Sequence, residues 1–177
     1  EKIMNPPIAP TVAPSYRDLA QNVAGLTDLI IREADEAEKL RHMSDTTYTA
    51  LQKNGLIHMM TPRDLGGSEL PWSDGLSIAE SVSRIDGSTG WCLMVSGVQH
   101  GGCGSLLTDT GCKEVFAAGT NTNVAGQGLP RGFARKVDGG YMIKGDWSYG
   151  SGIFHSNWVH SGCILMEDGQ PVMDDHG

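Results

Sequence analysis

The hydrophobic period of this chain changes once, close to Gly119, and this change limits what the chain can fold into more than any other feature. Upstream of Gly119, apolar residues recur at steps of three and four, which places them on one face of a helix. Downstream, short apolar runs are separated by glycine-rich turns, a pattern typical of strands. Helices followed by strands predict a multidomain α+β chain, with an all-α N-terminal domain over residues 16–119 and an antiparallel β-domain over 120–177.

The helical part divides at its capping signals. Ser44 followed by Asp45 is a typical N-cap, and Asn54-Gly55 is a typical helix end, so a short helix is expected between them. The expected helices are a long one from Tyr16 to about Lys39, this short one, one after Pro71 closed by Asp86-Gly87, a buried one over Thr89–Val98 and a short one over Lys113–Ala118. The expected strands cover 123–125, 132–137, 141–147 and 157–165.

Residues 1–15 contain four prolines and predict an extended arm rather than a regular element. The start lacks the apolar centre of a signal peptide, and no apolar run reaches the roughly 20 residues that cross a bilayer. The sequence therefore predicts a protein that neither enters a membrane nor carries a secretion signal.

Charge and cysteine content exclude further classes. The formal net charge is -8, and the 13 basic residues are scattered, so nucleic acid is not expected as a partner. The four cysteines form no CxxC pair, which favours free thiols in a reducing cytoplasm over disulfides or zinc. The six histidines show no metal spacing, and no metal is expected.

Two segments resemble the acyl-CoA dehydrogenase superfamily. The first runs from Asn54-Gly55-Leu56 through Thr61-Pro62 to Leu65-Gly66-Gly67 and resembles that family's helix, apolar connection and Pro-x-x-x-Gly-Gly turn. The second runs from Ala125-Gly126-Gln127-Gly128 to Gly145-Asp146-Trp147 and resembles its flavin-facing loop, hairpin and Gly-x-Trp strand. The resemblance implies that the β-domain is incomplete here, because the family continues with more of that domain and a C-terminal helical bundle that supplies a tetramer core.

The segment from Trp147 to Trp158 points to one branch of this superfamily. Its Trp, aromatic, Ser-Gly, His and Trp are similar to the oxygenase components of two-component flavin monooxygenases. The resemblance implies reduced FMN or FAD delivered by a separate flavin reductase, and transfer of one atom of dioxygen to an aromatic or other electron-rich small molecule. It also implies a homotetramer.

The resemblance assigns roles to residues on the strand side. Ser151, between two glycines, matches the serine placed beside the flavin N5, and Trp147 matches the tryptophan that packs on the ring system. Gln127 and Gly128 would face the polar edge of the ring. From the residues alone, a serine in a glycine turn, a core tryptophan and a plain turn at 126–128 remain open interpretations.

Trp91 and His100 are the candidates in the helical part. The hydroxylases carry a histidine near the flavin after a tryptophan, so Trp91 is expected at the cofactor and His100 in catalysis. On an ideal helix the nine-residue spacing rotates them roughly 180° apart, so both could face one site only if Gly97 breaks the helix. A loop role for His100 therefore stays open, and His155 is expected to make hydrogen bonds within the β-domain.

Three functions remain in order of preference. The first is the hydroxylase oxygenase component, with Ser151 and His100 as catalytic residues. The second is a dehydrogenase of acyl thioesters with tightly held FAD. The third is a fragment without catalysis that binds a partner.

Overall fold

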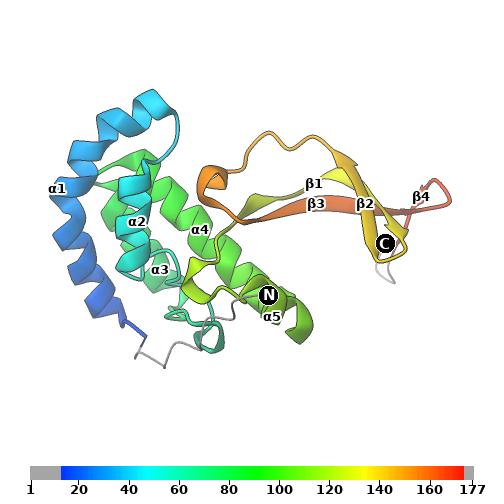
Figure 1. Cartoon of the computed structure of the whole chain (residues 1–177), viewed down its shortest axis with the longest axis horizontal. Coiled ribbons are helices and arrows are strands. Elements are labelled where there is room, and N and C mark those ends of the chain that lie inside the picture. Colours follow the sequence, from blue (N-terminus) through cyan, green and yellow to red (C-terminus); the bar gives the residue numbers. More distant parts are fainter. Residues whose placement is uncertain (1–12, 174–177) are drawn as a thin grey trace, which may run out of the picture.

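The structure is a computed structural model that describes residues 13–173, so most of the expected arm lies outside the described residues. The helices gather at one end of the molecule, and a twisted sheet projects from them (Figure 1). None of the helices within residues 13–173 is long and apolar enough to cross a membrane.

The first two helices begin and end where their capping residues predict. Helix α1 (Tyr16–Leu40) opens with a capping box between Ser15 and Asp18, and buries Leu19, Val23 and Ile30. Helix α2 (Asp45–Lys53) is capped by Ser44, whose hydroxyl accepts a hydrogen bond from the Thr47 N–H. These assignments confirm the periodicity and the caps read from the sequence.

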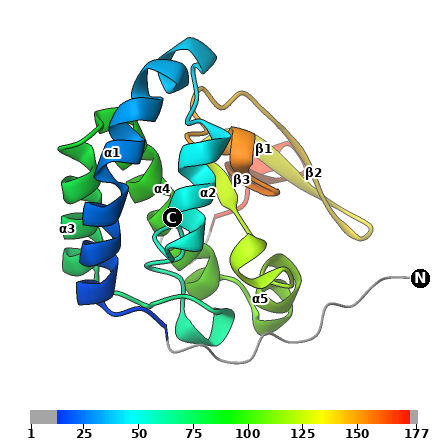
Figure 2. The same ribbon diagram turned by 60° about the vertical axis from the view of Figure 1, so that its left-hand side comes forward.

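An apolar connection forms the centre of the helical core. Leu56, Ile57, Met59 and Met60 follow α2 and are all buried. The buried core cluster joins them to the inner faces of α1, α3 (Trp72–Ser83) and α4 (Gly87–Leu106). Figure 2 shows α1, α3 and α4 side by side around this centre. This packing fixes α4, which runs from the core toward the sheet.

Helix α4 is longer than expected and starts earlier. Asp86 does not simply close the preceding helix, because its carboxylate accepts the Thr89 N–H and caps α4. The helix is also not buried on most sides, since Trp91 remains 57% exposed. Its buried face is rich in glycine, and an added Cβ at Gly97 or Gly101 would press on Met60. Small residues therefore let α4 lie directly on the core.

The connections between the larger elements include three short helical segments. These are η1 (Arg63–Leu65), α5 (Asp109–Val115) and η2 (Gly119–Asn121). The sheet contains β1 (Val124–Val137), β2 (Gly140–Gly145), β3 (Trp158–Glu167) and β4 (Gln170–Pro171), in the order β2-β1-β3-β4. Turns at Gly139-Gly140 and Asp168-Gly169 have positive φ, as the glycine-rich turn signals predict.

The prediction of an antiparallel sheet is wrong for its central pair. β1 pairs with β2 antiparallel but with β3 parallel, so the sheet is mixed. The reason is the connection over residues 146–157, which carries η3 (Ile153–His155) and returns the chain to the start of β1 before β3 begins. We call residues 146–157 the crossover segment, and it carries the strand-side candidate Ser151.

Candidate active site

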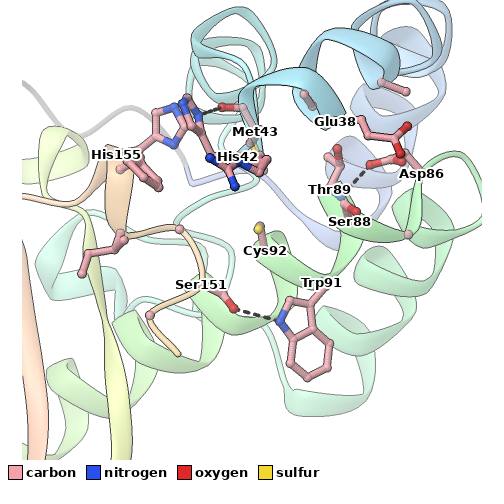
Figure 3. A pocket seen from close by; sticks show the side chains of 18 of the residues that line it. Glu38, His42, Met43, Asp86, Ser88, Thr89, Trp91, Cys92, Ser151 and His155 are labelled. Atoms are coloured by element: carbon pink, nitrogen blue, oxygen red, sulfur yellow. Dashed lines mark hydrogen bonds between the residues drawn. The ribbon is translucent and has the colours of Figure 1, made fainter. Parts of the chain in front are cut away.

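A cavity of about 810 Å3 lies where the crossover segment meets helices α1 and α4 (Figure 3). The crossover segment contributes Gly150, Ser151, Gly152, Ile153, Phe154 and His155, and the N-terminal turns of α4 contribute Trp91 and Cys92. The last turns of α1 and the residues after it contribute Glu38, Arg41, His42 and Met43. The predicted site residues Ser151 and Trp91 therefore line one cavity.

Trp91 and Ser151 are joined directly. The indole Nε1 of Trp91 donates a hydrogen bond of 3.0 Å to the Ser151 Oγ, drawn as a dashed line in Figure 3. The neighbouring residue Cys92 lines the same cavity as Gly152. Burial raises the pKa of the Cys92 thiol. Two consecutive residues of α4 therefore face the crossover segment, and Trp91 is the one that bonds to it.

Aromatic stacking holds the far end of the same segment. Phe154 stacks on His42 with ring centroids 4.4 Å apart, and His155 stacks on Tyr48 at the same separation. The His155 Nε2–H donates to the exposed carboxylate of Asp45 at 3.1 Å. Burial lowers the pKa of His155, and the Asp45 hydrogen bond opposes that shift. His155 therefore makes its side-chain bond to the helical part, not within the β-domain as expected. We call these five residues the aromatic clamp.

The rim of the cavity carries charges of both signs. Asp35 and Glu38 on α1 and Asp86 at the start of α4 are acidic, while Arg41 is basic. Arg41 is the C-cap of α1 and has a left-handed backbone, with φ of 59°. Such a conformation is uncommon for a residue with a side chain and places Arg41 at the turn into the clamp.

Trp147 lies against the sheet instead of in this cavity. Its indole packs on Gly132 and Gly145, where an added Cβ would overlap the ring. Its Nε1 donates to the Gly162 carbonyl at 3.0 Å. The two glycines form a seat for the indole, and this seat fixes where the crossover segment leaves β2.

Gln127 and Gly128 lie at an irregularity of the sheet. Four residues of β1 after Gln127 face only Gly162 of β3, which interrupts the parallel register. The Gln127 Oε1 and the His160 Nε2 are buried and have no hydrogen-bond partner within residues 13–173. The Gly126 carbonyl accepts from Gln99 on α4. Neither Gln127 nor Gly128 lines the cavity that contains Ser151.

His100 is fully buried beneath the point where α4 meets β1. Its Nδ1 lies 2.6 Å from the Ser96 carbonyl, which can only accept a hydrogen bond. Its Nε2 accepts from the Val124 N–H at 3.2 Å. The ring is therefore the neutral tautomer with the proton on Nδ1, and its free lone pair is already in use.

His100 is also separated from Trp91. Helix α4 is continuous from Gly87 to Leu106, so Gly97 does not break it, and the condition for both side chains to face one site is not met. His100 packs edge-on against His58 instead, with ring centroids 4.6 Å apart. His58 donates from Nε2 to the Thr120 carbonyl, and burial lowers its pKa to about 4. The two neutral rings join the helical core to the start of the sheet.

Sequence reasoning missed His42, Phe154 and Arg41 as cavity residues. His42 and Phe154 come from distant parts of the chain, and neither has a neighbour pattern that would mark it. Within residues 13–173, no group of three or more His, Cys, Asp or Glu side chains is arranged to hold a metal ion. The site therefore consists of a hydroxyl, aromatic side chains and a charged rim.

Comparison with known families identifies the helical part. A family profile described as "Acyl-CoA dehydrogenase, N-terminal domain" matches residues 14–115. The chain belongs to this family. The acyl-CoA dehydrogenase-like fold that the sequence predicts is thereby confirmed for the helices.

Similar proteins of this family are oxygenases. The chain is 30% identical over 152 residues to the "Flavin-dependent monooxygenase, oxygenase subunit HsaA" of Rhodococcus jostii, covering 86% of this chain and 40% of that protein. The crystal structure of the HsaA monooxygenase from M. tuberculosis superposes with a TM-score of 0.84 at 28% identity, over 90% of this chain and 43% of that one. The structure of XiaF from Streptomyces sp. in complex with FADH2 and glycerol superposes with a TM-score of 0.80 at 26% identity, over 89% and 40%. The chain spans about 40% of the length of these relatives.

Proposed function

We propose that this chain forms the helical domain and part of the β-domain of the oxygenase component of a two-component flavin-dependent monooxygenase. The whole protein would hydroxylate an aromatic or other electron-rich small molecule. When bound, the reduced flavin supplies the two electrons with which one atom of dioxygen enters the substrate and the other leaves as water. The similarity to oxygenase subunits supports this proposal over acyl-thioester oxidation.

The hydroxyl of Ser151 is the observation that carries the proposal. It lies at the wall of a cavity, on a loop held at both ends, and its only hydrogen bond within the described residues comes from Trp91. A hydroxyl fixed in this way can donate to the O4 carbonyl of a reduced flavin, next to N5, and help to exclude water there. Ser151 would hold the ring from this side, with Trp91 bonded to its oxygen.

The unpartnered polar atoms near Gly126 also suit a flavin. A buried polar atom without a partner costs about 1–3 kcal/mol, so Gln127 Oε1 and His160 Nε2 are suited to a ligand with polar edges. An isoalloxazine ring carries such groups on its pyrimidine side. The residues present therefore fit a flavin that extends beyond the Ser151 cavity, with Gln127 and Gly128 offering an amide oxygen and main chain. Trp147 would set the position of the loop from its glycine seat.

The cofactor and partners follow from the same assignment. The relative XiaF was solved with FADH2, and we propose reduced FAD or reduced FMN for this protein. A separate flavin reductase would deliver it. We also propose that the whole protein is a cytoplasmic homotetramer. Measurement of its molecular mass in solution tests the number of subunits.

The decisive experiment measures how the full-length protein treats reduced flavin. Chemically reduced FMN or FAD is bound under anaerobic conditions, and oxygen is then added while the return of the yellow oxidised flavin is followed. The proposal expects tighter binding of reduced than of oxidised flavin, and slower reoxidation than in free solution. Equal affinities for both forms and unchanged reoxidation would contradict it.

The same samples separate the competing dehydrogenase. A dehydrogenase of this fold would be purified yellow and would be bleached by acyl-CoA without a reductase. Bleaching of the protein by an acyl-CoA panel would replace the oxygenase assignment. The oxygenase instead requires reductase, reduced nicotinamide and oxygen together.

A further inference from the structure

We infer that Trp91 is a positioning residue that sets the direction of the Ser151 hydroxyl, turning its hydrogen toward the flavin. This inference rests on the proposed function and refines the expected role of Trp91, which was direct contact with the cofactor. The role predicts that the indole N–H, not the aromatic ring alone, matters for binding reduced flavin.

The chemistry of the two groups makes the hydrogen bond one-directional. The indole Nε1–H can only donate, so across the 3.0 Å contact the Ser151 oxygen must accept. One lone pair of the hydroxyl is thereby occupied, and its hydrogen cannot point toward Trp91. A serine hydroxyl that rotates freely can donate or accept a hydrogen bond and prefers neither.

No protein acceptor competes for that hydrogen. Among residues 13–173, no other hydrogen bond involves the Ser151 side chain. Ser151 lines the cavity, and Figure 3 shows it beside Trp91, across from His42 and Met43. The hydroxyl is thus prepared to donate outward to an acceptor of a ligand, such as the O4 carbonyl next to N5, because N5 of a reduced flavin carries a hydrogen and itself donates.

The geometry around the pair limits other directions. Trp91 is anchored on a continuous helix, and the adjacent Cys92 lines the same cavity as Gly152, the residue after Ser151. Gly152 has φ of 82°, a left-handed conformation that a residue with a side chain rarely adopts, so the turn after Ser151 depends on glycine. The backbones that carry the donor and the acceptor are therefore set by α4 and by this turn, and the Trp91–Ser151 hydrogen bond orients the two side chains.

A double-mutant cycle tests the inference in the full-length protein. The variants are Trp91→Phe, which keeps a ring but removes the N–H, Ser151→Ala, and both together. Dissociation constants for reduced FMN and reduced FAD are measured by anaerobic titration, and the thermal midpoint without flavin is recorded. Trp91→Phe is expected to weaken binding about fivefold when Ser151 is present, equivalent to about 1 kcal/mol, and to have no effect when Ser151→Ala is already in place.

Two matched controls define the outcome. Trp72→Phe changes an exposed tryptophan at the start of α3, and Ser148→Ala changes another serine of the crossover segment that is bonded to Arg131. Both should leave the affinity for reduced flavin unchanged.

The inference is overturned, while the proposed function stands, if Trp91→Phe weakens binding equally with and without the serine hydroxyl, or in neither case. Failure of the unmodified protein to bind reduced flavin overturns both.

Discussion

The imidazole of His155 lies almost parallel to the phenol ring of Tyr48, with 4.4 Å between the ring centroids and 13° between the planes. One ring belongs to helix α2 and the other to the crossover segment. Together with the Asp45 hydrogen bond and the Phe154–His42 stack, this contact joins the segment that carries Ser151 to the helical part. The position of the hydroxyl therefore depends on packing that lies outside the sheet.

Loss of the aromatic clamp should loosen the crossover segment without unfolding the protein. Phe154→Ala is expected to raise the hydrogen-exchange rates of backbone amides in residues 146–157 several-fold, since a stacked pair contributes roughly 0.5–1.5 kcal/mol. Exchange followed by mass spectrometry provides the measurement. Tyr149→Ala is the control, because Tyr149 lies in the same segment and is as exposed as Phe154, 75% against 72%, but stacks on no ring among the described residues. Unchanged exchange in Phe154→Ala would show that the stack does not restrain the loop.

Filling the glycine seat of Trp147 should destabilise the protein. In Gly132→Ala the new methyl group overlaps the indole, and overpacking of this kind costs about 1–3 kcal/mol. Denaturant unfolding measures the loss, and the second change Trp147→Leu should restore part of it. Gly25→Ala in α1 has no atom within 4 Å of the added methyl and should be neutral or slightly stabilising. If Gly132→Ala and Gly25→Ala changed the free energy of unfolding equally, the packing of Trp147 on Gly132 would not explain the loss.

The buried His58 should make stability fall in mild acid. Its pKa of about 4 in the folded protein lies below the ordinary value of 6.5, so between these values the unfolded chain binds more protons. The contribution of His58 to the free energy of unfolding is therefore fully present above pH 6.5. It is lost as the pH falls toward 4, by about 3 kcal/mol in total. The pKa of His100 is lowered in the same direction. Thermal midpoints across this range provide the check.

A variant separates His58 from other acid effects. His58→Gln keeps an N–H that can reach the Thr120 carbonyl but does not titrate. Its midpoint should change less between pH 6.5 and 4 than that of the unmodified protein, even if it is lower at neutral pH. If the thermal midpoint falls equally steeply with pH in the variant and in the unmodified protein, groups other than His58 cause the pH dependence.

Removal of the Ser151 hydroxyl should uncouple oxygen consumption from hydroxylation. If Ser151 donates to the flavin, Ser151→Ala should lower the fraction of oxygen that appears in product by roughly tenfold and release the rest as hydrogen peroxide. Peroxide and product are measured in the same reaction with the reductase. Ser151→Thr keeps a hydroxyl and should retain more of the coupling. Coupling that survives in Ser151→Ala would leave the serine without a role in the reaction.

The sequence predicted the elements of this protein better than their pairing. Caps such as Ser44 and the apolar steps along α1 are local signals, and the structure confirms them. The parallel pairing of β1 with β3 depends on where the crossover segment crosses the sheet, which no local pattern encodes. Turn signals at 138–140 correctly predict the antiparallel hairpin of β1 and β2, but that direction does not extend to the pairing of β1 with β3.

The site was predictable to the same degree. The family resemblance indicates Ser151 through the segment from Trp147 to Trp158 and Trp91 through its position before His100, and the structure brings the two into contact. His42 and Phe154 were not selected, because stacking between distant residues leaves no periodic trace. His100 was selected for its residue type, yet its burial and its two fixed hydrogen bonds become visible only once α4 and β1 are placed together.

The double attachment of the crossover segment has a consequence for how this protein can be altered. Residues 146–157 are bonded to α4 through Ser151 and to α2 and the residues after α1 through the aromatic clamp. An added residue would be taken up within this loop, since loops accept insertions more readily than paired strands shift register, and it would move Ser151 relative to Trp91. Attempts to redesign the cavity by grafting longer loops would therefore displace the hydroxyl first, whereas point changes at Ile153 keep the spacing between the two attachments.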